Sequence, residues 1–76
     1  MKAKVYSTPV CPHCRHAKEF LREKGVEVQD IDVSSDRDAA MEMVNKSGQM
    51  GVPVIEINNK IIVGFNQEAL EAEIKE

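Results

Sequence analysis

The chain has 76 residues, 42% of them apolar and 30% charged, which suits one small globular domain over residues 1–76 and leaves no room for a second. Thirteen acidic against ten basic residues give a net charge of −3, which gives no support to nucleic-acid binding. The longest apolar runs are far too short to span a bilayer, and the first residues lead into a strand-like segment rather than a secretory leader. We therefore expect a cytoplasmic protein without a membrane part.

The first predicted elements are a strand and a helix. Residues 4–7 are rich in strand formers, and the strand should close at Pro9. Pro12 stands where a helix tolerates proline best, in its first turn, with Cys11 at or near the N-cap. An apolar stripe follows one face of this helix until Gly25, a residue that favours a C-terminal stop.

A second strand and a second helix follow. Residues 26–33 have the composition of a strand, but the apolar phase slips between Val28 and Ile31, which leaves the register of this strand open. Residues 35–38 resemble a helix start with acidic charge in its first turn, and this helix should end at Gly48.

The last third of the chain has a different pattern of predicted elements, with two strands joined by a short turn and then a helix. Residues 53–57 and 60–63 are predicted strands, and the Asn58–Asn59 pair between them accepts the positive φ angles of a tight hairpin. These two strands should be antiparallel. Asn66 is a good N-cap for a final helix, whose Leu70 should face inward.

The predicted order of elements is therefore βαβαββα. A βαβ start requires a parallel, right-handed crossover, and the terminal hairpin adds antiparallel strands. We expect an α/β domain in which three helices flank a mixed four-stranded sheet.

The chemistry should lie at Cys11-Pro12-His13-Cys14, which follows the first strand and opens the first helix. Unpaired N–H groups and the positive end of a helix favour an anion, so they should stabilise the thiolate of Cys11 and make it the nucleophile. His13 is expected to tune this thiolate, and six of the ten basic residues fall within residues 1–24. Cys14, one turn further along the apolar face, is suited to resolving a mixed disulfide.

Two other roles for the cysteines are open. As a staple, a disulfide that closes a four-residue ring contributes only about 2 kcal/mol, too little to hold distant segments together. As metal ligands, Cys11, His13, Cys14 and His16 offer donors that zinc or copper accepts. Helical residues at i and i+2 point away from each other, however, so we predict no metal site and keep a metal or iron–sulfur cluster carrier as the alternative function.

The combined pattern resembles a small glutaredoxin of the thioredoxin superfamily. The segments that match are Val5-Tyr6-Ser7, Cys11-Pro12-His13-Cys14, Val52-Pro53 and Gly64-Phe65-Asn66. The order of elements extends the match over essentially the whole chain. The resemblance implies a thioredoxin-like, glutaredoxin-type fold. It also implies a cis bond between Val52 and Pro53 beside the cysteines, which the residues alone allow but do not demonstrate.

A binding site for glutathione is also implied by the resemblance. The backbone of Val52 would pair with an extended thiol substrate, a mode in which main-chain hydrogen bonds supply the affinity. Gly64, Phe65 and Asn66, with the N-terminus of the last helix, would receive the γ-glutamyl carboxylate, in keeping with the preference of helix N-termini for anions. Gln49 matches a position that often helps to bind the other carboxylate.

Three positions depart from the family pattern. Thr8 stands where glutaredoxins usually carry Lys or Arg, so one carboxylate anchor is missing. His13 replaces the usual Tyr between the cysteines, which implies a higher redox potential than is usual for a cytosolic reductant. Gly51 replaces the Thr commonly found before Val-Pro.

The resulting hypothesis is a thiol–disulfide oxidoreductase that reduces protein or glutathione mixed disulfides through a dithiol/disulfide cycle of Cys11 and Cys14. It should need no bound cofactor, with glutathione as a co-substrate. Glutathione or a flavoprotein such as thioredoxin reductase should return it to the dithiol form. Its expected partners are disulfide-containing proteins, and we expect a monomer.

Overall fold

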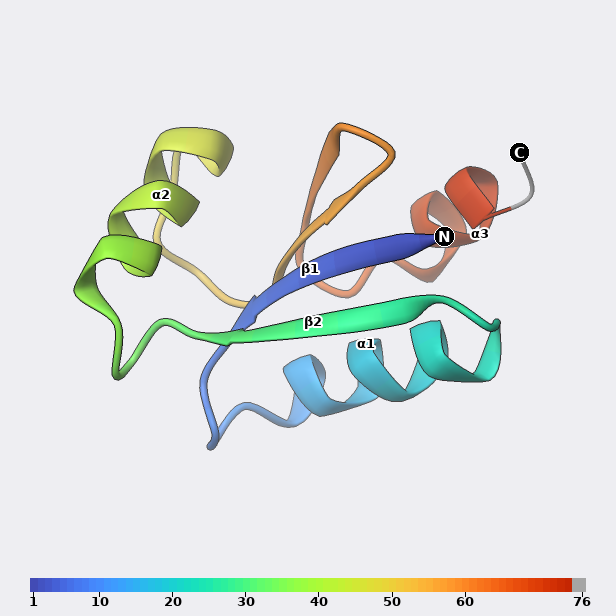
Figure 1. Ribbon diagram of the computed structural model, residues 1–76, viewed down its shortest axis with the longest axis horizontal. Coiled ribbons are helices and arrows are strands. Elements are labelled where there is room, and N and C mark those ends of the chain that lie inside the picture. Colours follow the sequence, from blue (N-terminus) through green and yellow to red (C-terminus); the bar gives the residue numbers. More distant parts are fainter. Residues whose placement is uncertain (75–76) are drawn as a thin grey trace.

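The fold contains seven elements in the predicted order (Figure 1). The structure, a computed structural model, describes residues 1–74, so the single domain predicted for residues 1–76 ends outside the described range. The elements are β1 (Lys2–Ser7), α1 (Pro12–Glu23), β2 (Glu27–Asp32), α2 (Arg37–Ser47), β3 (Val54–Ile57), β4 (Lys60–Val63) and α3 (Gln67–Ile74).

The four strands form one mixed sheet in the order β2-β1-β3-β4. β1 runs parallel to β2 and antiparallel to β3, and β4 is antiparallel to β3. The crossover between the parallel strands contains α1. The hairpin turns at Asn58 and Asn59, whose φ angles are 52° and 63°. The predicted βαβαββα fold, with a mixed sheet and three helices, is confirmed.

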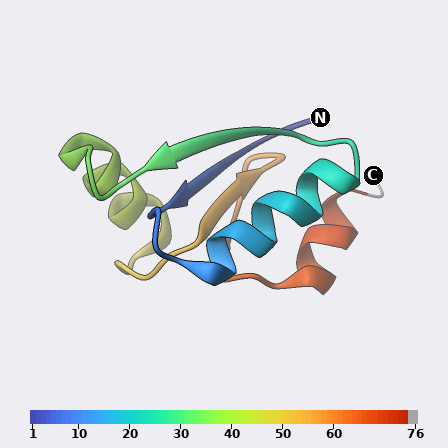
Figure 2. The ribbon, with the colours of Figure 1, turned by 90° about the horizontal axis from the view of Figure 1, so that it is seen from below.

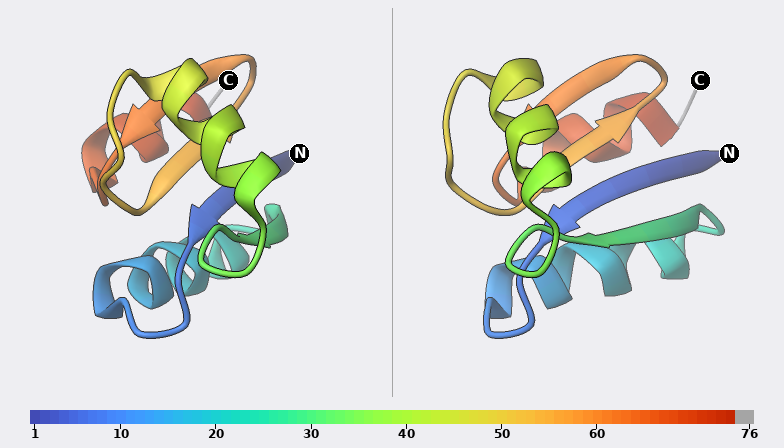
Figure 3. Two further views of the ribbon diagram at one scale, coloured as in Figure 1. Left: turned by 90° about the vertical axis from the view of Figure 1, so that its left-hand side faces the viewer. Right: turned by 60° about the vertical axis from the view of Figure 1, so that its left-hand side comes forward.

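Helices cover both faces of this sheet. α1 and α3 lie together on one face, where Leu21 and Leu70 pack in one core with Ile55 (Figure 2). α2 lies on the opposite face, where Met43 packs in a second core with Tyr6 (Figure 3). We call these the α1 face and the α2 face.

The phase slip in β2 follows from this division. Val28 packs against the core of the α1 face, whereas Ile31 packs against the core of the α2 face. Two residues three positions apart in a strand point to opposite sides of the sheet. A strand that serves both cores cannot show one alternating apolar pattern.

Strand boundaries differ from the sequence expectation, whereas the helix ends agree with it. β1 begins two residues earlier than predicted because Lys2 already pairs with Glu27. β2 is one residue shorter at each end, and β3 starts at Val54 rather than Pro53. The predicted N-caps, Cys11 and Asn66, both accept a helical N–H. Within residues 1–74, no helix is both long enough and apolar enough to cross a membrane.

Candidate functional site

The Cys11 thiol lies at the N-terminus of α1. β1 ends at Ser7, the Cys11 N–H donates to the Thr8 carbonyl at 3.4 Å, and α1 begins at Pro12. Cys11 has extended backbone angles, and its sulfur accepts the N–H of Cys14 at 3.2 Å. The sulfur thus satisfies one of the N–H groups that the first helical turn leaves unpaired, and these groups favour negative charge on it.

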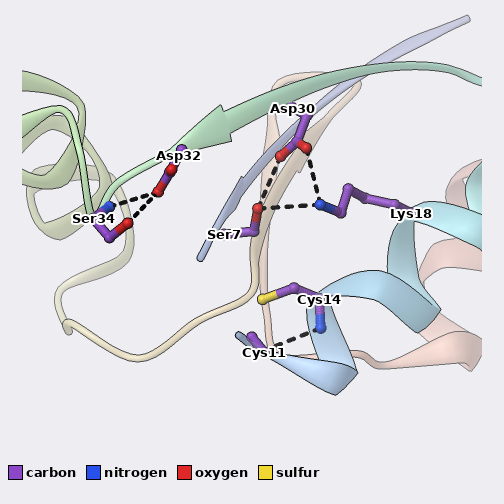
Figure 4. A network of polar contacts seen from close by, with 7 residues as sticks. All are labelled: Ser7, Cys11, Cys14, Lys18, Asp30, Asp32 and Ser34. Atoms are coloured by element: carbon purple, nitrogen blue, oxygen red, sulfur yellow. Dashed lines mark hydrogen bonds and ion pairs between the residues drawn. The ribbon is translucent and has the colours of Figure 1, made fainter. Parts of the chain in front are cut away.

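Cys14 has a different environment from Cys11 (Figure 4). Both thiols are free, but Cys14 is completely buried, whereas Cys11 is half-buried. Burial, followed by the neighbouring Cys11 thiol, raises the pKa of Cys14 to about 11, against the opposing effects of the Thr8 backbone and the Lys18 charge. Cys11 is therefore the thiol that a substrate disulfide can reach.

The two residues between the cysteines face solvent. Pro12 opens α1, where its missing N–H costs nothing because that N–H would have no helical partner. The side chain of His13 is exposed, as is that of His16. His13 lies within the same turn as both thiols, and its tuning of the Cys11 thiolate stays a prediction.

A cleft of about 370 Å³ opens beside the nucleophile. Its lining consists of Pro9, Val10, Cys11, Pro12 and Arg15. Val10, on the wall of this cleft, is 88% exposed. The cleft gives a substrate disulfide an approach to Cys11 from solvent.

The predicted substrate-binding residues form a second group. The Val52–Pro53 peptide bond is cis, Pro53 is buried, and Val52 packs against the core of the α2 face. The Gly64 N–H donates to the Pro53 carbonyl at 2.8 Å, which ties the two predicted binding segments together. Phe65 packs on Phe20 of α1, with ring centroids 5.8 Å apart.

Two further predicted ligands make hydrogen bonds within the chain. Asn66 Oδ1 accepts the Ala69 N–H at 3.1 Å and so caps α3. The Gln49 amide accepts the Gly51 N–H and donates to the Gly51 carbonyl at 3.0 Å. A Cβ at Gly51 would lie 2.7 Å from Gln49 Oε1, so glycine leaves room for this contact. Gln49 thus braces the segment before the cis-proline, a role that the sequence did not indicate, and its contact with a carboxylate stays a prediction.

A polar network beside Cys14 was not anticipated from the sequence. Ser7 Oγ donates to Asp30 Oδ1 at 2.8 Å, and Lys18 Nζ donates to Asp30 Oδ2 at 2.9 Å and to Ser7 Oγ at 3.5 Å (Figure 4). Burial raises the pKa of Asp30, but hydrogen bonds from Lys18 and Ser7 outweigh it and hold the pKa below its usual value. The available signal was the four-residue spacing of Cys14 and Lys18, which places both on one face of a helix.

Within residues 1–74, no three His, Cys, Asp or Glu side chains gather in an arrangement that could hold a metal ion. The two cysteines differ in burial and in pKa, and such a pair of unequal thiols suits disulfide exchange.

Known proteins are similar to this chain in sequence and in fold. A family model described as Glutaredoxin matches residues 3–62. The chain is 46% identical over 68 residues to an uncharacterized glutaredoxin-like 8.6 kDa protein in the rubredoxin operon of Clostridium pasteurianum. The aligned region covers 90% of this chain and 91% of that protein. It is 35% identical over 60 residues to glutaredoxin 3 of Escherichia coli K12, and this aligned region covers 79% of the present chain and 72% of glutaredoxin 3.

The structural comparison agrees with the sequence comparison. The crystal structure of a glutaredoxin from Archaeoglobus fulgidus matches with a TM-score of 0.88 and 28% identity, covering 97% of this chain and 86% of that one. The fold, the thiol pair and the family match over most of the chain therefore lead to the same conclusion. The chain belongs to the glutaredoxin family, and its general function is thiol redox chemistry.

Proposed function

We propose that the chain is a dithiol oxidoreductase that reduces protein disulfides or glutathione mixed disulfides through Cys11 and Cys14. The contrast between the two thiols carries the proposal. Cys11 lies at the N-cap of α1 beside an open cleft, whereas Cys14 is completely buried one turn further along. A substrate can reach the first thiol, whereas the buried second thiol has Cys11 Sγ as its neighbouring sulfur.

The cycle has two exchange steps. In the first, the Cys11 thiolate attacks one sulfur of the substrate disulfide, so a mixed disulfide forms while the substrate S–S bond breaks and its other sulfur leaves as a thiolate. In the second, Cys14 loses its proton and attacks Cys11 Sγ, which releases the remaining substrate sulfur and leaves a Cys11–Cys14 disulfide. Both released thiolates take up protons, and two electrons have passed to the substrate.

Glutathione enters this proposal as a co-substrate, and no bound cofactor is required. Two glutathione molecules, or a flavoprotein reductase, would return the oxidised pair to the dithiol. The backbone of Val52 and the segment 64–66 would bind the peptide part and one carboxylate, and the hydrogen bond between Gly64 and Pro53 supports a joint site. Because Thr8 carries no charge and Gln49 is engaged within its own loop, we expect glutathione to bind weakly.

A disulfide-reduction assay with two electron donors tests the proposal. One reaction contains glutathione with glutathione reductase, and the other contains thioredoxin reductase, each with NADPH and with a protein disulfide or a glutathione mixed disulfide as substrate. We expect turnover with at least one donor and a loss of about 100-fold or more in Cys11→Ser. Cys14→Ser should lose reduction of protein disulfides and retain part of the activity on glutathione mixed disulfides.

These two serine variants are matched in size and in chemistry, so their contrast separates the roles of the thiols. Activity that survives in Cys11→Ser, or no turnover of the wild-type protein with either donor, would contradict the proposal.

A further inference from the structure

The network of Ser7, Lys18 and Asp30 takes no part in the first exchange step, in which Cys11 attacks from the solvent side. It lies on the inner side of α1, together with Cys14 (Figure 4). We propose that Lys18 is a positioning residue for the resolving step: its ammonium group, held by Asp30 and Ser7, stabilises the Cys14 thiolate that attacks Cys11. This inference rests on the proposed function and concerns the second half of its cycle.

The helix places Lys18 next to Cys14. Residues four apart on a helix face are neighbours, with their Cβ atoms about 5–6 Å apart. The Lys18 side chain is only 16% exposed, whereas lysines normally extend their ammonium group into solvent. The charge of Lys18 is therefore directed along the protein surface toward the sheet.

Two partners on neighbouring strands fix this ammonium group. Lys18 Nζ lies 2.9 Å from Asp30 Oδ2 on β2 and 3.5 Å from Ser7 Oγ at the end of β1. Ser7 is itself 2% exposed, and its hydroxyl donates to Asp30 Oδ1 at 2.8 Å. Because the cation is already oriented, it does not need to reorganise when negative charge develops beside it, which is the condition for strong electrostatic stabilisation.

The resolving step needs such stabilisation because Cys14 is buried. In the reduced protein the pKa of Cys14 is about 11, so only about one Cys14 thiol in ten thousand is ionised at pH 7. Lys18 on α1 lowers this pKa, while the neighbouring Cys11 raises it. Of the other elements nearby, β2 contributes Asp30, whose negative charge and the positive charge of Lys18 partly offset each other, and residues 51–53 contribute no ionisable side chain.

The chemistry of the step is that of thiol–disulfide exchange. Cys14 releases its proton to water, and its thiolate attacks Cys11 Sγ of the mixed disulfide. The Cys11–Cys14 bond forms as the bond from Cys11 to the substrate sulfur breaks, and the departing thiolate takes the electron pair and then a proton. Lys18 keeps its proton throughout and acts only through its charge.

A chromogenic aromatic disulfide, dithiobis(nitrobenzoate), resolves the two steps in the reduced protein. With one equivalent of reagent, Cys11 releases a first thionitrobenzoate and Cys14 then displaces the second from Cys11. Stopped-flow absorbance measures both rates as a function of pH. We expect Lys18→Gln to slow the second release about three- to tenfold at pH 7 and to move its pH midpoint upward. The first release should change less than twofold, and Lys18→Arg should restore most of the second rate.

Matched variants make the result decisive. Lys24→Gln removes the same charge just beyond the other end of α1 and should leave both releases unchanged, and Cys14→Ser should abolish only the second. If Lys18→Gln does not fold, Lys18→Met keeps the apolar stem and carries the same test. A missing first release in the wild-type protein would refute the proposed function. An intact first release with an unchanged second release in the Lys18 variant, or an equal slowing of both, would overturn the present inference alone.

Discussion

Consecutive residues of β1 place two hydroxyl groups on opposite faces of the sheet. On the α2 face, the Tyr6 hydroxyl donates to the Glu42 carboxylate and accepts from Lys46 Nζ at 3.2 Å. Lys46 also pairs with Glu56 at 3.0 Å, and the hydrogen bonds with Glu56 and Tyr6 raise the pKa of this lysine above its usual range.

On the α1 face, the Ser7 hydroxyl has corresponding partners in Asp30 and Lys18. The difference lies in what stands beside the lysine. Lys18 follows Cys14 by one helical turn, whereas α2 contains no cysteine. The hydroxyl, carboxylate and lysine of the α1 face therefore lie one helical turn from a thiol, and those of the α2 face do not.

The largest expected effect on stability comes from truncating a buried side chain in each of the two cores. Leu21 belongs to a cluster of eight buried residues on the α1 face, and Met43 to a cluster of three on the α2 face. We expect Leu21→Ala to lower the free energy of unfolding by about 3–4 kcal/mol and Met43→Ala by about 2–3 kcal/mol, because a larger core collapses less around a cavity. Urea denaturation at pH 7 measures both values, and a reversed order would show that the α2 face carries more of the stability.

Alkaline pH should destabilise the reduced protein through the α1 face first. The folded-state pKa of Cys14, about 11, is raised from an ordinary value near 9, so the folded chain holds this proton more tightly than the unfolded chain. The corresponding stability is complete below about pH 8.5 and is lost as the pH rises to about 11, a loss of about 2–3 kcal/mol. Urea denaturation of the reduced protein between pH 8 and 11 measures this loss.

Single substitutions assign this pH dependence to one face or the other. Cys14→Ser should remove the loss of unfolding free energy between pH 9 and 11. Burial, and then the bond to Glu42, also raise the pKa of Tyr6, so Tyr6→Phe should remove a separate part at higher pH. If the unfolding free energy of Cys14→Ser falls with pH as steeply as that of the wild-type protein, the raised pKa of the Cys14 thiol is contradicted.

Removal of each hydroxyl gives the closest comparison between the faces. Tyr6→Phe and Ser7→Ala each delete one buried hydroxyl, and each should cost about 1 kcal/mol of unfolding free energy. Only Ser7→Ala should slow the second thionitrobenzoate release, by less than Lys18→Gln does, because Asp30 still holds the lysine. Equal effects of the two variants on that release would remove the distinction between the faces.

The smallest effect expected concerns charge added to each face. Thr8→Lys restores the cation that the family usually carries before the nucleophile and should lower the KM for glutathione about three- to fivefold, with stability unchanged. Met41→Lys adds the same charge to an exposed position on α2, 59% accessible, and should leave KM unchanged. Steady-state kinetics with glutathione as the varied substrate measures both.

Features with a local cause could be predicted from the sequence. Local residues determine the N-caps Cys11 and Asn66 and the turn at Asn58–Asn59. These boundaries were enough to predict the order of elements and the mixed sheet. The unequal thiols followed as well, because Cys14 lies on the apolar face of an amphipathic helix.

Features that depend on which face a residue meets could not be predicted. β2 showed no single alternation because Val28 and Ile31 serve opposite cores. The hydrogen-bond partners of Tyr6 and Ser7 could not be predicted, because they depend on which helix covers each face of the sheet. The bracing role of Gln49 requires the conformation of the loop before Val52, which no pattern in the sequence specifies.

The position of the Cys11 sulfur has a consequence for how the redox state can be observed. That sulfur accepts the Cys14 N–H, so any chemical change at Cys11 is also a change of the cap of α1. A substrate attached to Cys11, or a disulfide formed there, replaces the free sulfur with a disulfide sulfur, which is a weaker acceptor, and this costs the first turn about 1 kcal/mol of capping free energy. Amide hydrogen exchange at Cys14 should therefore quicken as the protein is oxidised, which makes the backbone of the helix itself a reporter of each exchange step.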